Sequence, residues 1–105
     1  MVATVWNNGS FKSSGSGYGI KLSKVDRDIY FKKEWTSVIL ELGEGEVIIE
    51  VNVNKDSFWS KCRELLNKDI GVWLIKNENG SWKKGKPPKL KIENISGNRF
   101  KVESL

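Results

Sequence analysis

The stretch "TSVILELGEGEVIIEVNV", residues 36–53, decides the fold because it has the pattern of a complete β-hairpin. Strand side chains alternate between two faces, so a turn at Glu44-Gly45 fixes which residues lie opposite each other. One face is then wholly apolar, with three cross-strand pairs: Leu42 with Val47, Leu40 with Ile49, and Val38 with Val51. The other face pairs Ile39 with Glu50 and Glu41 with Ile48. We expect this half-acidic face to be partly exposed.

A second hairpin is predicted near the N-terminus, in "VWNNGSFK", residues 5–12. Asn8-Gly9 is the favoured two-residue type I′ turn, because both positions need a positive φ. This turn would pair Asn7 with Ser10 and set Trp6 opposite Phe11.

The segment after this hairpin predicts a loop and then a strand. Residues 12–17, "KSSGSG", have the composition of a flexible loop. The overlapping "GSGYG", residues 15–19, has neither the dinucleotide-binding spacing nor the P-loop spacing, so we interpret it as a hairpin connection. In "GYGIKLS", residues 17–23, Tyr18, Ile20 and Leu22 fall on one face.

A third hairpin is predicted in "PKLKIENISGNRFKVES", residues 88–104. A loop of residues 96–98 with Gly97 left-handed would place Ile92 opposite Val102 on the inner face. On the outer face, opposite charges would pair: Lys91 with Glu103, and Glu93 with Lys101.

The period changes in "KDSFWSKCRELLNKD", residues 55–69, where apolar residues recur at helical spacing. They predict a helix over about residues 56–67. Its apolar stripe would bury Trp59 and make Cys62 an inert thiol. Residues 70–77 fit a buried strand or a second helix equally well, and residues 26–35 fit a turn with either a short strand or one helical turn.

Together these elements predict a β-rich α+β protein, with residues 1–105 as a single domain. The expected architecture is an antiparallel meander or a small open barrel of six to eight short strands with one main helix. Strand and helix do not alternate, which argues against a doubly wound βαβ fold.

Composition excludes several functional classes. The chain has no histidine and one cysteine, so the usual Ser-His and Cys-His pairs, an internal disulfide and a structural zinc site are all ruled out. Asp26-Arg27-Asp28 is a weak candidate for a cation site, and a local ion pair with turn capping explains it better. We therefore expect a non-catalytic protein with no cofactor and no metal. No signal-peptide pattern or membrane-spanning run is present, which predicts a cytoplasmic location and no membrane partner.

The net charge of +5 is concentrated at one end of the chain. Residues 1–75 sum to zero, whereas residues 76–105 carry eight bases and three acids. "SWKKGKPPKLK", residues 81–91, contains five lysines and no acid. Such a concentration indicates an oriented basic face.

This basic face is the candidate site, and its predicted partner is nucleic acid, single- or double-stranded, bound with little sequence preference. Lysines would contact phosphates, and an aromatic side chain would stack on an unpaired base. The predicted binding residues are Trp82, Lys83, Lys84, Lys86, Lys89 and, more weakly, Arg99.

Alternatives remain open at this stage. The loop could simply be solvated, with Trp82 turned into the core. The protein could instead be a protein-interaction or accessory module, with the acidic residues of 34–50 contacting another copy. Trp73 is expected in the core, and Trp6, Trp35 and Trp82 are expected to be partly exposed.

Overall fold

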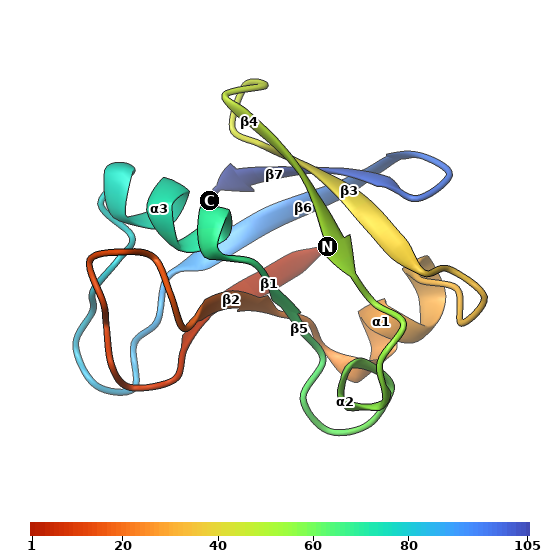
Figure 1. The fold of residues 1–105 in the computed structure, drawn as a ribbon, viewed down its shortest axis with the longest axis horizontal. Coiled ribbons are helices and arrows are strands. Elements are labelled where there is room, and N and C mark those ends of the chain that lie inside the picture. The colour runs from red at the N-terminus through yellow and green to blue at the C-terminus, as the bar shows by residue number, and fades with distance from the viewer.

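The computed structural model describes all residues 1–105, which form seven strands and three short helices. Figure 1 shows their arrangement. The strands are β1 (Val2–Asn7), β2 (Tyr18–Lys21), β3 (Ser37–Leu42), β4 (Val47–Asn52), β5 (Glu64–Leu66), β6 (Lys89–Ser96) and β7 (Arg99–Ser104). The helices are α1 (Lys24–Tyr30), α2 (Asp56–Trp59) and α3 (Lys68–Lys76). The predicted β-rich α+β class is confirmed.

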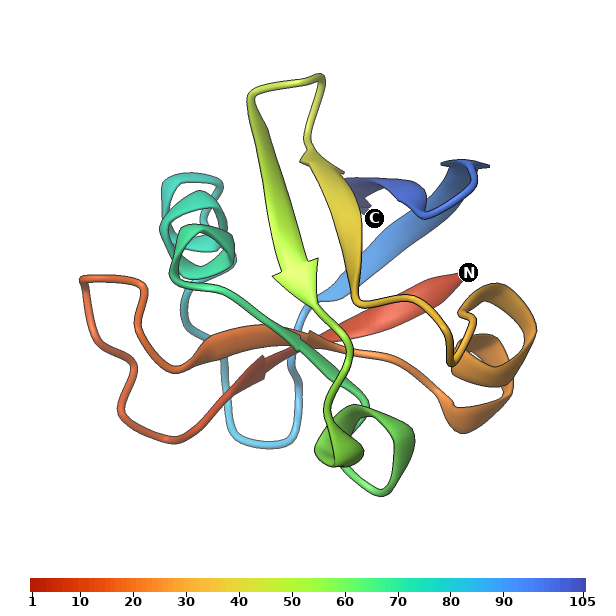
Figure 2. The same ribbon diagram turned by 45° about the vertical axis from the view of Figure 1, so that its right-hand side comes forward.

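All seven strands belong to one sheet, in the order β4-β3-β7-β6-β1-β2-β5. The pairing of β3 with β7 is parallel and the others are antiparallel, so the sheet is mixed and not purely antiparallel. The sheet curls into a nearly closed barrel (Figures 1 and 2). Its two edge strands approach each other where the Asn67 side chain after β5 donates to the Glu50 carbonyl of β4, at 3.3 Å.

The hairpin of residues 36–53 is confirmed in register. All five predicted pairs are present, from Val38 with Val51 to Leu42 with Val47. The inner face is buried apart from the half-buried Val47, and on the outer face Ile48 is 58% exposed. The turn itself differs: residues 43–46 form it, and the positive φ values fall at Gly43 and Gly45 instead of Glu44-Gly45.

The predicted hairpin around Asn8-Gly9 is wrong. β1 pairs with β2, setting Trp6 opposite Gly19 and Asn7 opposite Tyr18. The Asn7 side chain instead accepts from the backbone N–H groups of Gly9 and Phe11, at 2.8 and 3.1 Å. Such side-chain bonds compete with a strand ladder, and they turn residues 8–17 into one long loop. The predicted inner face of Tyr18, Ile20 and Leu22 is confirmed, because all three are buried.

The predicted helix at 56–67 is also wrong. α2 ends at Trp59, and Arg63, with φ of 54°, redirects the chain into β5. β5 pairs with β2, so Leu65 is buried opposite Ile20. Pairing with an open sheet edge satisfies the backbone of 64–66 better than a helix on the surface would.

Two side-chain predictions in this region fail with that helix. Cys62 is exposed because it lies in the turn after α2. Trp59 is only half-buried, with its indole N–H donating to the Val53 carbonyl at 3.1 Å.

The ambiguous segments resolve as helices. Residues 70–77 lie mostly in α3, whose N-cap Asn67 accepts from the Asp69 N–H at 2.8 Å. Trp73 in α3 is buried as expected. Residues 26–30 complete α1, capped by Ser23, and the predicted local ion pair joins Arg27 and Asp28 at 2.9 Å.

The C-terminal hairpin has the predicted register, with Ile92 and Val102 both buried and opposite each other. Gly97 is left-handed at φ 52°, and a bulge lies between Asn94 and Ser96, so that Ser96 pairs with Arg99. The outer charges are neutralised chiefly along each strand: Lys91 lies 2.7 Å from Glu93, and Lys101 lies 3.0 Å from Glu103. None of the three helices is long and apolar enough to cross a bilayer.

Candidate nucleic-acid interface

The predicted basic site lies in the connection between α3 and β6, residues 77–88. Lys83, Lys84 and Lys86 are exposed, and none of them lies in an ion pair. The Lys86 N–H donates to the Lys83 carbonyl at 2.9 Å, closing a turn through Gly85 at φ 79°. The three ammonium groups are therefore carried on a tight turn and are free to meet an anion.

The far side of this turn is anchored to the sheet. Pro87 and Pro88 are half-buried, and the Pro88 carbonyl accepts from the Val5 N–H of β1 at 3.0 Å. Lys89 begins β6, and its ammonium group donates to the Thr4 hydroxyl at 2.8 Å. Lys89 thus remains exposed but is held against the sheet, whereas the other three lysines are not.

Trp82 is half-buried and packs against the hydrophobic core. It is therefore neither fully exposed, as a binding arm would be, nor fully inside the core. Its ring meets Phe11 of the loop 8–17 edge to face, with centroids 5.0 Å apart and planes at 70°. Phe11 is 43% exposed, so the pair presents an aromatic surface to solvent. Trp6 and Trp35 are likewise half-buried, as expected.

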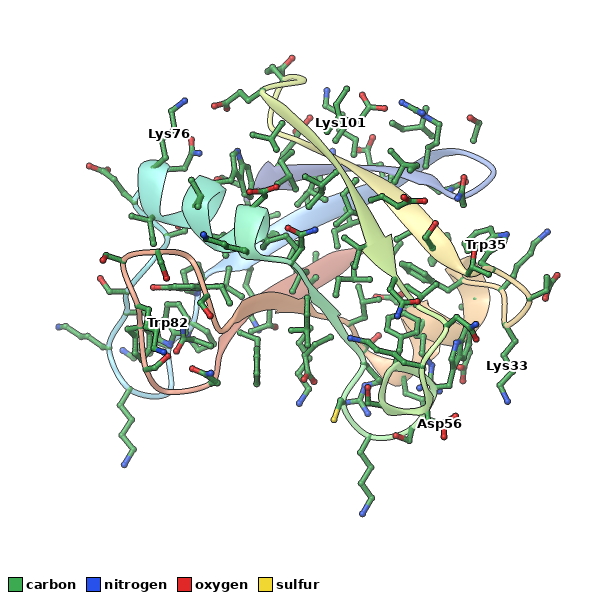
Figure 3. The ribbon with its side chains drawn as sticks, viewed as in Figure 1. Lys33, Trp35, Asp56, Lys76, Trp82 and Lys101 are labelled. Carbon is green, nitrogen blue, oxygen red and sulfur yellow. The ribbon has the colours of Figure 1, made fainter.

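Loops 8–17 and 77–88 lie side by side (Figures 1 and 3), and Trp82 lies next to the first loop in Figure 3. The buried Tyr18 hydroxyl donates to the Gly80 carbonyl, and burial raises the pKa of Tyr18. Loop 8–17 also packs on α3, where the Gly15 backbone lies so close to Gly71 that an added Cβ would clash with the Gly15 carbonyl oxygen. These contacts bring Lys12 to the same end of the molecule as the basic turn.

Phe11 and Lys12 were missing from the site predicted from sequence. The Asn8-Gly9 turn placed Phe11 on a strand opposite Trp6, and Lys12 had no basic neighbours in the sequence. The sequence signal that could have found these two residues is the glycine- and serine-rich segment 12–17, which begins directly after Phe11.

Arg99 is not brought together with the other predicted residues. It lies at the start of β7, at the opposite end of the β6–β7 hairpin from the basic turn. Its guanidinium group donates to the Glu41 carboxylate at 3.0 Å, so its charge is already compensated.

Unpaired lysines also occur elsewhere. Lys32, Lys33, Lys55 and Lys61 form no ion pair, and Lys33 lies far from Trp82 in Figure 3. The net charge by segment does not reveal this second group of lysines, because acidic residues elsewhere in residues 1–75 cancel their charge in the sum. It has no exposed aromatic pair of the Phe11–Trp82 kind.

The structure contains no cluster of three or more potential cysteine, aspartate or glutamate metal ligands. Comparison with known proteins adds no relative: no protein-family model, no curated protein and no solved structure matches the chain.

Proposed function

We propose that the protein is a small non-catalytic nucleic-acid-binding module with little sequence preference. The observation that carries the proposal is the unpaired turn Lys83–Lys86 beside the solvent-facing Phe11–Trp82 pair. Ammonium groups without acid partners are available to neutralise phosphates and release their counterions. An exposed aromatic surface next to them provides a base-stacking platform.

The charge arrangement gives the bound polyanion an orientation. The acids of the β3–β4 hairpin engage cations of other elements: Glu46 lies 3.6 Å from Lys76, and Glu44 lies 3.8 Å from Lys101. In Figure 1 the turn between β3 and β4 lies at the top, whereas the loop of residues 77–88 runs from the end of α3 down to the lower left. The unpaired lysines of the basic turn therefore attract phosphates more strongly than this charge-compensated hairpin does.

Little sequence preference follows from the chemistry of the side chains. Lysine is a flexible point charge and contacts phosphate without reading base identity. The basic turn carries no arginine, asparagine or glutamine, the side chains that make bidentate contacts with guanine or adenine.

A salt-dependent titration tests the proposal. Fluorescence anisotropy of fluorescein-labelled oligonucleotides of about 16 nucleotides, single-stranded and duplex, would be measured from ~50 to ~200 mM salt. We expect log K to fall against log salt with a slope of about −2 to −3 for a single strand held at three or four phosphates. Absence of binding to both oligonucleotides at the lowest salt would overturn the proposal.

A protein-interaction module is the second candidate, because α1 carries an unpartnered apolar face. Val25 and Ile29, one helical turn apart, are 65% and 66% exposed, and Tyr30 next to them is 42% exposed. Sedimentation velocity tests this function: self-association that Ile29→Asp abolishes would support it, and a monomer at all concentrations with no co-purifying protein would count against it.

A further inference from the structure

A hollow of about 480 Å³ opens between the two loops of the proposed interface. It adjoins the Phe11–Trp82 contact and lies outside the basic turn Lys83–Lys86. Its lining residues are Phe11, Ser13, Tyr18, Ile75, Glu78, Gly80 and Ser81.

Backbone strain is concentrated at this hollow. Three non-glycine residues of the chain have positive φ, and two of them, Phe11 at 47° and Glu78 at 62°, line it. A bulky residue rarely adopts this conformation, and such outliers cluster at binding sites. The two strained residues lie on the two loops that border the same space.

The walls combine the chemistry that an unpaired nucleobase needs. Phe11 and Ile75 are 43% and 37% exposed and offer apolar faces. Glu78 is the single charged lining residue, and its carboxylate is an acceptor that repels phosphate but takes the amino group of a base. Two cations follow this aromatic pair directly in the sequence: Lys12 adjoins Phe11, and Lys83 adjoins Trp82.

We infer that this hollow receives one unpaired base of a single-stranded nucleic acid, stacked against Phe11, while Lys12, Lys83 and Lys84 hold the flanking phosphates. The inference rests on the proposed function and specifies its ligand as single-stranded. A duplex keeps its bases stacked inside, so it reaches the lysines but not the hollow.

The experiment compares a fluorescein-labelled single-stranded oligonucleotide with the blunt-ended duplex that the same strand forms with its complement, by anisotropy at low salt. We expect tighter binding of the single strand. Phe11→Ala should weaken single-strand binding by about 5- to 150-fold and leave duplex binding unchanged. Phe11→Tyr should retain single-strand binding, because the tyrosine ring also stacks.

Ile48→Ala is the matched control, since Ile48 is an exposed apolar residue, 58% accessible, on β4 away from both loops. It should change neither affinity. If Phe11→Ala fails to fold by circular dichroism, Phe11→Gly carries the same expectation, because glycine adopts the left-handed backbone without strain.

Glu78 gives a second readout that does not depend on stacking. Cytosine and thymine are matched pyrimidines, but only cytosine presents an amino group. We expect oligo-dC to bind about 2- to 12-fold more tightly than oligo-dT, and Glu78→Gly to abolish that difference.

The outcomes separate the inference from the proposed function. Equal binding of single strand and duplex, with Phe11→Ala unchanged and Lys83→Glu with Lys84→Glu weakened, would overturn the hollow as a base site and leave nucleic-acid binding standing. Absence of binding to either oligonucleotide would overturn both.

Discussion

At the scale of single residues, one buried cation ties α1 to the segment after β4. Arg27 is 4% exposed and donates to the Phe58 and Ser60 carbonyls at 3.0 and 3.1 Å. Its guanidinium carbon also lies 5.3 Å from the Trp59 ring centroid. Sequence periodicity alone provided no indication that α1 and the segment around residues 58–60 are in contact.

We expect Arg27→Ala to lower the free energy of unfolding by about 1–3 kcal/mol, because the buried Phe58 carbonyl loses its donor. Urea denaturation monitored by tryptophan fluorescence measures it. Lys24→Ala is the control: its pair with Asp28 at 3.0 Å is exposed and screened by solvent, so this substitution should change the free energy of unfolding much less. Equal effects of the two substitutions would show that Arg27 has no structural role.

Glu64 makes stability depend on pH. Burial raises its pKa above the ordinary glutamate value, and Lys21, 3.9 Å away, only partly opposes this. A raised pKa in the folded state means that the protonated form fits the fold better. Its stabilising contribution is complete below the unfolded-state pKa of about 4.3 and is lost as pH rises through the folded-state pKa.

Glu64→Gln, which stays neutral, should therefore be more stable than the wild type at pH 7, and this advantage should shrink towards pH 4. Urea midpoints of both proteins at the two pH values measure the difference. A stability difference that is the same at both values would contradict the assignment.

At the scale of elements, the contact between loop 8–17 and α3 depends on two glycines. Gly71 lies in α3 directly against the Gly15 backbone, so no side chain fits between them. The aromatic pair and the hollow both depend on the position of this loop.

Gly71→Ala should destabilise the protein by about 1–3 kcal/mol through overpacking, although alanine is the better helix former. Thermal unfolding by circular dichroism measures this. Lys76→Ala in the same helix should be nearly neutral, since it loses only an exposed pair with Glu46. A stabilised Gly71→Ala protein would show that the loop moves freely.

Sequence alone predicted the elements whose register is set by local alternation. Residues 36–53 pair as expected because their apolar face leaves one acceptable register. The helix at 56–67 failed because β5 has only three residues and is specified by the distant β2 edge. Phe11 was predicted on a strand because the sequence does not show which group pairs with its backbone. In the structure the Asn7 side chain, and not a neighbouring strand, accepts from the Gly9 and Phe11 N–H groups.

At the scale of the whole molecule, the cations on the β3–β4–β7 side differ from those of loop 77–88. On the β3–β4–β7 side, Lys76, Arg99 and Lys101 are paired with glutamates. Around loop 77–88, Lys83, Lys84 and Lys86 are unpaired. Counting charges along the sequence located the excess of positive charge in residues 76–105. It could not show that Arg99, which lies in that segment, is paired with Glu41.

The most direct test of the central claim is a salt-series titration of a fluorescein-labelled single-stranded oligonucleotide with wild type, Lys83→Glu with Lys84→Glu, and Lys32→Glu with Lys33→Glu. Both double variants change the charge equally, at different places on the surface. We predict that the first weakens binding for every sequence and reduces the slope of log K against log salt by about 0.7 per lysine, whereas the second changes the slope little. An unchanged slope in the first variant, or an equal loss in both, would contradict the basic turn as the binding site.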